Sequence, residues 1–344
     1  MIETAEAKSP PDRSWRQVVA PFETPSLARS IGQIADSVLP YLALLVAMDL
    51  SLKVSYWLTL ALAVPAAGFL MRIFIIFHDC GHGSFFRSGR ANRVLGFVTG
   101  VLVFTPSRAW HKRHAKHHAS SGDLDRRGTG DVWTLTVTEY RALPAWERLK
   151  YRLFRHPVVL LGLGPAYTFF IEHRFWQPQD GRSERWNTVL SDLTIAGIAL
   201  LACATIGWKA YLLIQVPVML IAGTLGVWLF YVQHQFEGTY WERHGQWNWV
   251  NQAIHGSSFY KLPGILRWFS GNIGYHHIHH LSPRIPNYYL RPCHESHPMF
   301  RAVTPVTFRK SLRSLGFRLW DEDRHKLVGF GDIAGNGPPT AIPS

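Results

Sequence analysis

This 344-residue chain contains three histidine clusters, and the type and spacing of these residues could support chemistry. They read HDCGH at 78–82, HAKHH at 114–118 and HHIHH at 276–280. Residues three or four positions apart lie on one face of a helix, so each cluster can direct two or three imidazoles at one point. Neutral imidazole binds iron, copper, nickel and zinc, and eight converging imidazoles exceed what one ion takes. The clusters therefore predict two metal ions close together.

The residue types within the clusters narrow the chemistry. The clusters contain no Glu, and their one Asp, Asp79, adjoins His78 instead of lying one helical turn away. A carboxylate-rich di-iron bundle and an HExxH zinc protease are both disfavoured. An all-histidine set leaves the charge of the ions largely uncompensated, which suits an open site at which dioxygen supplies further ligands. The expected chemistry is oxidation of an unreactive C–H bond by activated O2.

Two further histidines compete for places in this set, and the others stand alone. His111 lies three residues before His114 and could replace His117 on a helical face. His277 is expected to point about 100° away from His276. A nonspecific metal-binding tract would be contiguous and terminal, whereas these clusters are internal. The histidines expected to be solvated or hydrogen-bonded are His156, His173, His244, His255, His294, His297 and His325.

The elements that position the clusters are expected to lie in a membrane. Hydrophobic residues make up 47% of the chain and charged residues 17%, against roughly 25% charged residues in soluble domains. The 14 Trp, 12 Tyr and 20 Phe suit apolar spans with interfacial anchors. The net charge of +13 lies in loops beside apolar segments, which indicates positive-inside topology and argues against a nucleic-acid partner. Three scattered cysteines, Cys80, Cys203 and Cys293, form neither a disulfide framework nor a zinc ribbon.

Four apolar segments predict two membrane hairpins. The first hairpin pairs Val38–Met48, which is short for a span, with Val54–Phe77. The single charge in the longer segment, Arg72, is expected to snorkel to the lipid headgroups. The second hairpin pairs Val189–Gly207 with Ala210–Val232. Each hairpin is followed by histidine clusters.

The predicted topology places all three clusters on one side of the membrane. Only short apolar pieces, at 94–104 and 158–171, lie between the two hairpins, and they are expected to be interfacial, re-entrant or buried against the site. Lys and Arg are dense on the histidine side, whereas only Lys53 and Lys209 lie near the opposite turns. By the positive-inside rule the clusters and both termini face the cytoplasm.

The chain is expected to form one membrane domain with two appendages. Its start is polar to about Pro25 and contains no apolar h-region, which indicates a cytosolic arm and no cleaved signal peptide. The expected boundaries are 1–30 for the N-terminal arm, 31–325 for the membrane domain and 326–344 for the C-terminal tail.

The residues around the clusters resemble a known family. The runs concerned are RIFIIF at 72–77, SGDLDRRGTGDVW at 121–133, VQHQFE at 232–237, GSSFYKLP at 256–263, GNIGY at 271–275 and LSPRIPNY at 281–288. Together with the three clusters, in this order around a membrane hairpin, they resemble the integral-membrane fatty acid desaturases. The resemblance covers roughly residues 35–325 and is closest to the bacterial acyl-lipid desaturases of the delta-5 and delta-12 type.

The resemblance implies a set of metal ligands. Asp79, Asp123 and Asp125 are candidates to orient imidazole N–H groups from outside the ligand shell. Asn272, four residues before the third cluster, is a candidate outer or water-mediated ligand. The residues that match the family's metal ligands are His78, His82, His114, His117, His118, His276, His279 and His280, with His234 completing the set.

The resemblance also implies a fold and a reaction. The fold is all-α and polytopic, with four transmembrane helices in two hairpins and a cytoplasmic helical cap that holds a di-iron site. The reaction uses O2 and two electrons to remove two hydrogens from adjacent methylenes of a membrane-lipid acyl chain, leaving a cis double bond. Trp133, Phe74 and Phe77 are candidates to line the acyl tunnel. The expected location is a bacterial inner membrane.

The electrons are expected to come from a partner protein. The chain has no GxGxxG dinucleotide fingerprint, no four-cysteine iron–sulfur set and no CxxCH haem site. A donor of the ferredoxin, flavodoxin or cytochrome b5 type is expected on the basic cytoplasmic face, at Lys112, Arg113 and Lys116.

Alternatives on the same scaffold are a carotenoid ketolase or hydroxylase and a lipid or alkane hydroxylase. The non-enzyme alternative is a membrane receptor or metal sensor. The sequence leaves open the double-bond position, the chain length, a lipid versus an acyl-CoA substrate, the donor and the oligomeric state. It also leaves open whether His111 or His277 replaces a predicted ligand.

Overall fold

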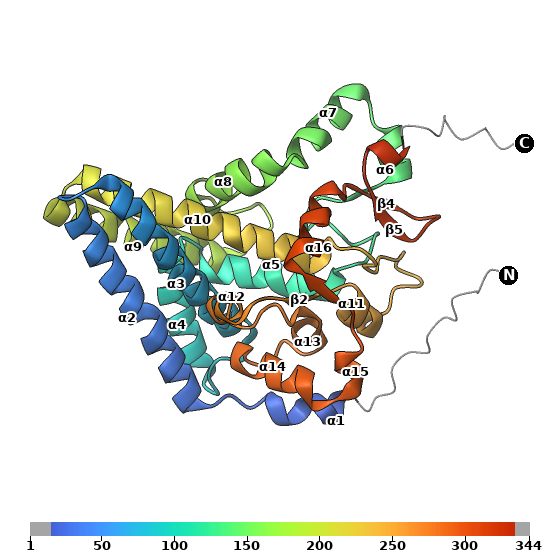
Figure 1. Cartoon of the computed structure of the whole chain (residues 1–344), viewed down its shortest axis with the longest axis horizontal. Helices are drawn as coiled ribbons and strands as arrows, with labels where there is room; N and C mark the ends of the chain where they lie inside the picture. The colour runs from blue at the N-terminus through green and yellow to red at the C-terminus, as the bar shows by residue number, and fades with distance from the viewer. Residues whose placement is uncertain (1–14, 334–344) are drawn as a thin grey trace, which may run out of the picture.

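The computed structural model describes residues 15–333, most of which are helical. Within this range, four helices are long and apolar enough to cross a membrane, as the two predicted hairpins require. Figure 1 shows both hairpin turns at the left edge and the remaining elements gathered toward the other end of the long helices. The four helices are α2 (Leu27–Ser51), α3 (Tyr56–His82), α9 (Arg182–Ile206) and α10 (Trp208–His234).

The long helices extend beyond the predicted apolar segments. α2 begins at Leu27 instead of Val38, because the Ser26 side chain accepts a hydrogen bond from the Arg29 backbone N–H and caps the helix. Both α3 and α10 continue into histidines at their ends. α9 and α10 are joined by Gly207 alone, whose φ of +87° lies in the left-handed region that favours glycine.

α3 is the central helix of the molecule. It packs against α2, α10 and α4 (Gly89–Leu102). Its buried residues include Ala63, Ala66 and Ala67, which are small enough to let the neighbouring helices approach closely. Met48 of α2 and Val218 of α10 belong to the same buried cluster. The end of α3 that carries histidines is therefore held firmly relative to both hairpins.

The cap is built from short helices. The apolar piece at 94–104 falls largely within α4, and the piece at 158–171 forms a π-helical turn (Val159–Leu163) and α8, which pack on α10. Neither piece is among the candidate spans. The other cap helices are α1 (Trp15–Val19), α5 (Ser107–Ser120), α6 (Val137–Ala142), α7 (Ala145–Phe154), α8 (Gly164–Phe170), α11 (Trp249–His255), α12 (Gly264–Phe269), α13 (His276–Leu281), α14 (Asn287–Ser296), α15 (Pro298–Arg301) and α16 (Phe308–Arg313).

Two small sheets, which the apolar pattern did not reveal, join distant parts of the cap. One sheet has the order β1-β4-β5, with β4 parallel to β1 and antiparallel to β5. The other pairs β2 with β3 in parallel. Strands of two or three residues are too short to produce an alternating pattern. Their bounds are β1 (Leu135–Thr136), β2 (Phe259–Lys261), β3 (Pro305–Thr307), β4 (Leu319–Asp321) and β5 (Lys326–Val328).

Both ends of the described range pack onto the cap. Trp15 and Val19, within the predicted arm, are buried in a cluster with Ile278 and Leu281 of α13. β5, within the predicted tail, pairs with β4. Residues 1–14 and 334–344, the remainder of the predicted arm and tail, lie outside the described residues. The proposed domain boundaries stay a prediction.

Candidate metal centre

Four elements bring histidines to one region. The last turns of α3 carry His78 and His82 on one face, and α3 stops because Gly83 adopts φ +69° and returns its N–H to the Cys80 carbonyl. α5 carries the second cluster, α13 begins at the third cluster, and α10 ends at His234. The histidine spacing within each helix follows the local 3.6-residue repeat.

Hydrogen bonds between backbone segments align the third cluster with the end of α10. Ser258 N–H donates to the Gln233 carbonyl at 2.9 Å, which ties the residue before β2 to α10. Tyr260 N–H, within β2, donates to the Gly274 carbonyl at 2.7 Å, just before α13. The short strand β2 is therefore the connection that places α13 opposite His234.

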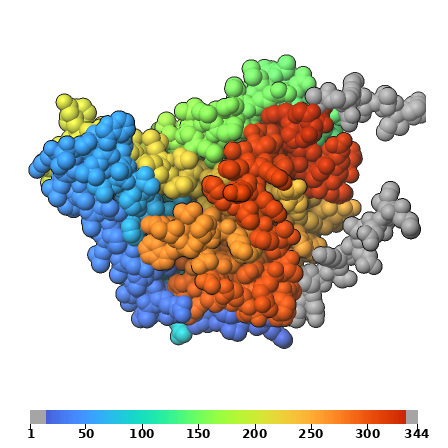
Figure 2. Space-filling view, viewed as in Figure 1, coloured from blue at the N-terminus to red at the C-terminus, as the bar shows by residue number. Residues whose placement is uncertain are grey.

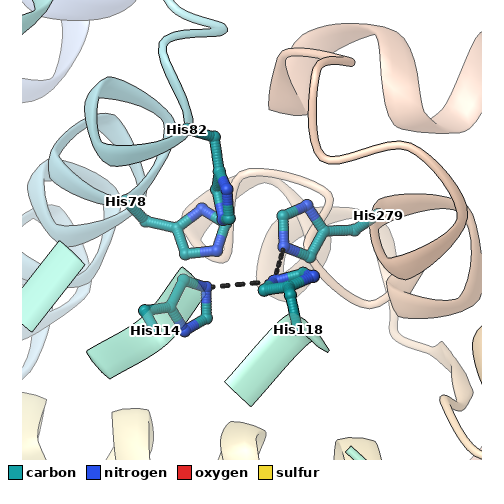
Figure 3. A group of neighbouring side chains, drawn as sticks. All are labelled: His78, His82, His114, His118 and His279. Carbon is teal, nitrogen blue, oxygen red and sulfur yellow. Dashed lines mark hydrogen bonds between the residues drawn. The ribbon is translucent and has the colours of Figure 1, made fainter. Parts of the chain in front are cut away.

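The first histidine group lies between α3, α5 and α13. Its ligand-capable nitrogens all lie within 4.8 Å of one another. Figure 3 shows the five imidazole rings pointing toward a common centre, with His118 Nε2 3.2 Å from His114 Nε2 and 3.0 Å from His279 Nε2. The group consists of His78, His82, His114, His118 and His279.

The second histidine group lies between α5, α10 and α13, and all of its members are buried. Its ligand-capable nitrogens also lie within 4.8 Å of one another. His234 Nε2 is central, at 3.1 Å from His117 Nε2 and 3.0 Å from His276 Nε2. The group consists of His117, His234, His276 and His280. The nine histidines expected from the sequence are thus divided into five and four.

The two groups adjoin each other. The His118 ring of the first group stacks on the His280 ring of the second, with 4.1 Å between centroids and 18° between planes. His117 and His118 are sequence neighbours on α5 and belong to different groups. Two ions bound in these groups would therefore share a wall of imidazole rings.

The charge state of the rings suits metal binding. Burial holds the pKa of His114, His118, His276, His279 and His280 well below the usual range, and neighbouring imidazoles lower each pKa further. These rings are therefore neutral at physiological pH and offer lone pairs. Within residues 15–333, His82 Nε2 and His280 Nε2 make no hydrogen bond although they are buried. Unpaired buried nitrogens are costly, and coordination to a cation would satisfy them.

Two buried carboxylates orient rings from outside the groups. Asp79 Oδ1 lies 3.1 Å from His78 Nδ1, and its Oδ2 accepts hydrogen bonds from the backbone and side-chain N–H groups of Asn287 at 2.7 and 2.8 Å. Asp131 Oδ1 lies 2.6 Å from His117 Nδ1. Carboxylate contacts at Nδ1 leave Nε2 free for a metal. Asp79 was expected in this position, whereas Asp131 was not.

Asp123 and Asp125 lie elsewhere. Asp123 Oδ2 contacts His244 Nδ1 at 2.7 Å, and Asp125 pairs with Arg243 at 2.7 Å. These contacts connect the loop after α5 with the loop after α10, and neither carboxylate touches a ring of the two groups. Asp131 lies in the same run as Asp123 and Asp125, residues 121–133, which carries part of the family resemblance. Its place in this run is the feature of the sequence that could have identified it. Gly130 adopts φ +72°, and a Cβ atom at this position would lie only 3.1 Å from the His117 Cβ atom, so the glycine lets the loop pass close to His117.

Asn272 also lies away from the rings. Its side-chain N–H donates to the Asn287 carbonyl at 3.3 Å, and its backbone adopts a positive φ of 59°. It lines a cavity on the far side of Asn287 together with Arg72 and Trp268. The amide is therefore placed to build a neighbouring surface and not to contact the histidine groups directly.

The two competing histidines belong to neither group. His111 Nε2 donates to the Phe77 carbonyl at 3.1 Å, and burial lowers its pKa to about 4. His277 Nε2 lies 3.0 Å from His294 Nδ1, and burial lowers its pKa to about 3. Both are buried neutral rings held by neighbours in the protein, which is an ordinary structural role.

Aromatic side chains form an apolar wall beside the groups. Trp110 stacks on His114 at 4.5 Å and also contacts Phe77 and Phe74. Phe230 lies 5.3 Å from His117. Trp133 instead packs on Tyr151 and Phe154, in a separate cluster. Phe74 and Phe77 therefore adjoin the first group through Trp110, Trp133 contacts no histidine of either group, and Trp110 and Phe230 contact histidines of the groups directly. The lining of the acyl tunnel stays a prediction.

One cavity on the described surface reaches a histidine of the first group. Its volume is about 520 Å³, and its lining includes His82, Glu23, Arg87 and Arg284. His82 is half-buried, in contrast to the fully buried rings of the second group. The first group is thus the more accessible of the two from this side of the molecule.

Comparison with known proteins agrees with this geometry. Residues 55–309 match the family model described as fatty acid desaturase. The chain is 52% identical over 312 residues to a fatty acid desaturase of Bacillus subtilis (strain 168), covering 91% of this chain and 89% of the relative. It is 27% identical to an sn-1 acyl-lipid omega-3 desaturase (ferredoxin) of Nostoc sp. (strain 36), covering 72% and 69%. It is 26% identical to an acyl-lipid omega-3 desaturase (cytochrome b5) of the endoplasmic reticulum of Arabidopsis thaliana, covering 76% and 69%. With its four apolar helices and converging histidines, this chain belongs to the fatty acid desaturase family of oxidoreductases.

Proposed function

We propose that the chain is an acyl-lipid desaturase that inserts a cis double bond into the acyl chain of a membrane lipid. The observation that carries the proposal is the pair of adjoining histidine groups, with five and four members, at the ends of apolar helices. Acyl-lipid desaturases among the relatives support the choice of substrate class. The overall reaction converts two neighbouring methylenes, O2, two electrons and two protons into a cis double bond and two molecules of water.

The residues fit a di-iron centre. The first group would hold one ion and the second group the other, since each offers at least four imidazoles within reach of one point. Five and four imidazoles are fewer than the six ligands of an octahedral ion, so positions would remain for O2. When bound, the iron ions would supply the oxidising power needed to break unactivated C–H bonds. The chain itself holds the ions, orients the rings and positions the substrate.

The outer carboxylates define which ring nitrogen faces the metal. Asp79 and Asp131 accept the Nδ1 protons of His78 and His117, and the Gly256 carbonyl lies 3.3 Å from His234 Nδ1. Each contact selects the tautomer whose Nε2 lone pair is free. We assign these three acceptors to ring orientation.

The substrate chain would pass along the aromatic wall. Trp110 presents an apolar ring beside the first group, with Phe77 packed against it, and Phe230 does so beside the second. An apolar wall excludes water from the reacting methylenes. Phe77 and Phe230 belong to two of the apolar helices, α3 and α10, which suits a substrate that arrives from the bilayer.

The electrons would come from a separate donor of the ferredoxin, flavodoxin or cytochrome b5 type. Relatives named for ferredoxin and for cytochrome b5 support this class of partner. By the positive-inside rule the histidine side would face the cytoplasm of a bacterial inner membrane, where such donors are soluble or membrane-anchored. We assign the domain that performs these tasks to residues 31–325.

The test is the fatty acid profile of a host that expresses the chain with a compatible donor. Mass spectrometry of derivatives that locate double bonds should reveal an unsaturated acid that is absent with His279→Ala and present with the control His325→Ala. His325 is an exposed histidine outside both groups. A hydroxylated product would replace this proposal with a hydroxylase. An unchanged profile from iron-loaded, electron-supplied protein would leave the receptor or sensor alternative.

A further inference from the structure

A polar cavity lies outside the metal centre, on the side of the cap that meets α2 and α3. Its volume is about 450 Å³, and residues of α2, α3, α12 and α14 line it. We propose that this cavity binds the phosphate of a glycerophospholipid headgroup and so selects phospholipids as substrates. The proposal rests on the proposed desaturase function and names its substrate class. The charged residues and the indole that line the cavity are Arg29, Asp36, Arg72, Arg267, Trp268 and Arg291.

The cavity carries an excess of positive charge. Arg72 is neutralised by Asp36, which accepts two hydrogen bonds from it at 3.0 and 3.1 Å. Arg291 pairs at 2.7 Å with Glu295, just outside the cavity. Within residues 15–333, Arg29 and Arg267 form no ion pair: Arg29 lies over the Tyr289 ring at 5.0 Å. Two uncompensated guanidinium groups therefore flank the cavity, and planar guanidinium groups match phosphate oxygens in pairs.

The cavity lies near the expected boundary between hydrocarbon and lipid headgroups on the histidine side. Arg72 is sixteen residues along α3 from Tyr56, a rise of about 24 Å, so it lies about 6 Å short of the far boundary of roughly 30 Å of hydrocarbon. α12 packs on α3 at this level, with Trp268 5.8 Å from Phe69. Its Ile265 side chain is 68% exposed and its Trp268 side chain 39% exposed, as expected for residues that enter the membrane interface. Figure 2 shows this orange segment seated against the blue helices.

The size and depth of the cavity favour a lipid over a protein partner. A cavity of about 450 Å³ has room for a headgroup and is too small for a folded protein domain. The exposed apolar residues of α12 lie beside the cavity, so acyl chains of a lipid held there would continue into the bilayer. The side-chain amides of Gln33 and Asn287 also line the cavity. Each amide donates a hydrogen bond of 3.0 Å to the other.

The cavity wall is continuous with the metal centre. Asn287 lines the cavity and donates two hydrogen bonds to Asp79, which in turn contacts His78. A phosphate fixed at the cavity would therefore stand at a set distance from the first histidine group. Such an anchor would determine which methylene pair reaches the histidines by its distance from the headgroup end of the lipid.

Lipid binding tests the proposal without turnover. The full-length protein is purified in detergent, supplied with phosphatidylglycerol or a neutral diglucosyl-diacylglycerol of the same acyl chains, and retained lipid is measured by native mass spectrometry. The double variant Arg29→Gln/Arg267→Gln should retain about tenfold less phosphatidylglycerol, because it loses charge-assisted hydrogen bonds, and unchanged glycolipid. The matched control Arg301→Gln/Arg309→Gln alters two exposed arginines outside the cavity and should bind as the wild type does.

Three results would overturn the proposal: equal retention of phosphatidylglycerol by the variant and the wild type, an equal loss of both lipids, or glycerol 3-phosphate that binds as tightly as the lipid. The last result would indicate a site for free phosphate compounds. Turnover is measured separately. Wild-type protein that binds phosphatidylglycerol through the two arginines and forms no unsaturated product would refute the desaturase function and leave the cavity assignment standing.

Discussion

Asp79 and Asp131 perform the same task in the two histidine groups. Each is a buried carboxylate that contacts the Nδ1 atom of one ring, His78 in the first group and His117 in the second. Each ring thereby turns its Nε2 atom toward the centre of its group. One carboxylate orients one ring in each group, so replacing that carboxylate tests the metal site assigned to the group.

Asp131→Asn should weaken metal retention. The amide keeps the shape and removes the charge that supports the His117 ring, so we expect iron to be lost to a chelator at about 10- to 100-fold lower chelator concentration than in the wild type. Asp125→Asn is the matched control, because Asp125 lies in the same run of residues and pairs with the exposed Arg243. Iron content measured by mass spectrometry checks the outcome. Equal retention by both variants would remove Asp131 from the metal centre.

His173 gives a pH dependence that is independent of the metal centre. Burial, together with the positive charges of Arg113 and Arg174, lowers its pKa to about 3, and Thr105 Oγ1 lies 3.3 Å from its Nδ1. The ordinary histidine pKa of about 6.5 applies in the unfolded chain. The unfolded state therefore binds more protons between these values, and the contribution of His173 is full above pH 6.5 and declines as the pH falls toward 3.

His173→Gln should reduce this acid sensitivity. Between pH 6.5 and 5 the wild type should lose about 2 kcal/mol more unfolding free energy than the variant, since each pH unit in this range corresponds to about 1.4 kcal/mol. Denaturant titration in detergent micelles at the two pH values measures the difference. Parallel losses in both proteins would show that His173 is already protonated in the folded state.

At the scale of elements, two ion pairs hold the long helices at similar depth. Arg72 of α3 pairs with Asp36 of α2, and Arg174 pairs with Asp192 of α9. Arg72 was expected to snorkel to the lipid headgroups, but its side chain is buried in the protein, donates to the Trp268 carbonyl and lies 3.7 Å from the Trp268 ring. Asp36, one helix away, compensates its charge within the protein.

The packing of α3 on α5 depends on a glycine between two predicted ligands. A Cβ atom at Gly81 would lie 2.3 Å from the His111 ring, and the ring is held by the Phe77 carbonyl. Gly96 of α4 lies against the same ring, and a Cβ atom at this position would lie 3.3 Å from His111. The absence of side chains here lets α5 bring its histidines against those of α3.

Gly81→Ala should therefore separate the two helices. We expect a loss of about 1–3 kcal/mol in unfolding free energy from overpacking, together with a lower iron content, because His78 and His82 flank the substituted position. Gly197→Ala in α9 is the control, since no atom lies within 4 Å of its Cβ position. The control should be neutral or stabilising by up to about 1 kcal/mol. Full iron content in the Gly81 variant would contradict this account of the packing.

At the scale of the whole molecule, charge and access would decide where the proposed electron donor docks. Two of the three residues first expected to dock the donor are near acids: Lys112 lies 3.9 Å from Glu184, and Arg113 lies 3.4 Å from Asp180. The cavity at His82 is lined by Arg87 and by Arg284, which lies 3.8 Å from Glu23, and it reaches a histidine of the first group. An acidic donor docked there would approach the centre more closely.

Charge reversal at the two surfaces distinguishes them. Arg87→Glu/Arg284→Glu should slow reduction by an acidic donor about tenfold at low ionic strength, with the effect shrinking as salt is added and the iron content unchanged. Lys112→Glu/Arg113→Glu/Lys116→Glu is the comparison and should have the smaller effect. Stopped-flow reduction kinetics measure both. A larger effect from the second variant would move the docking surface back to α5.

Local sequence patterns determined much of this molecule. The lengths of the apolar segments predicted four spans in two hairpins, because a bilayer demands long uninterrupted helices whatever their neighbours are. The spacing within each cluster predicted which rings share a helix face, since the helical repeat is a property of adjacent residues. The expected nine histidines all fall within the two groups.

Only the tertiary structure decided how those histidines are divided. His118 joins the rings of α3 while its neighbour His117 joins His234, more than a hundred residues away. Likewise, Asp131 and not Asp123 reaches a ring of the metal centre. Such pairings depend on how α3, α5, α10 and α13 bury their apolar faces against one another, and on short strands such as β2 that fix the resulting register. Helical periodicity contains no information on contacts between segments so distant in the chain.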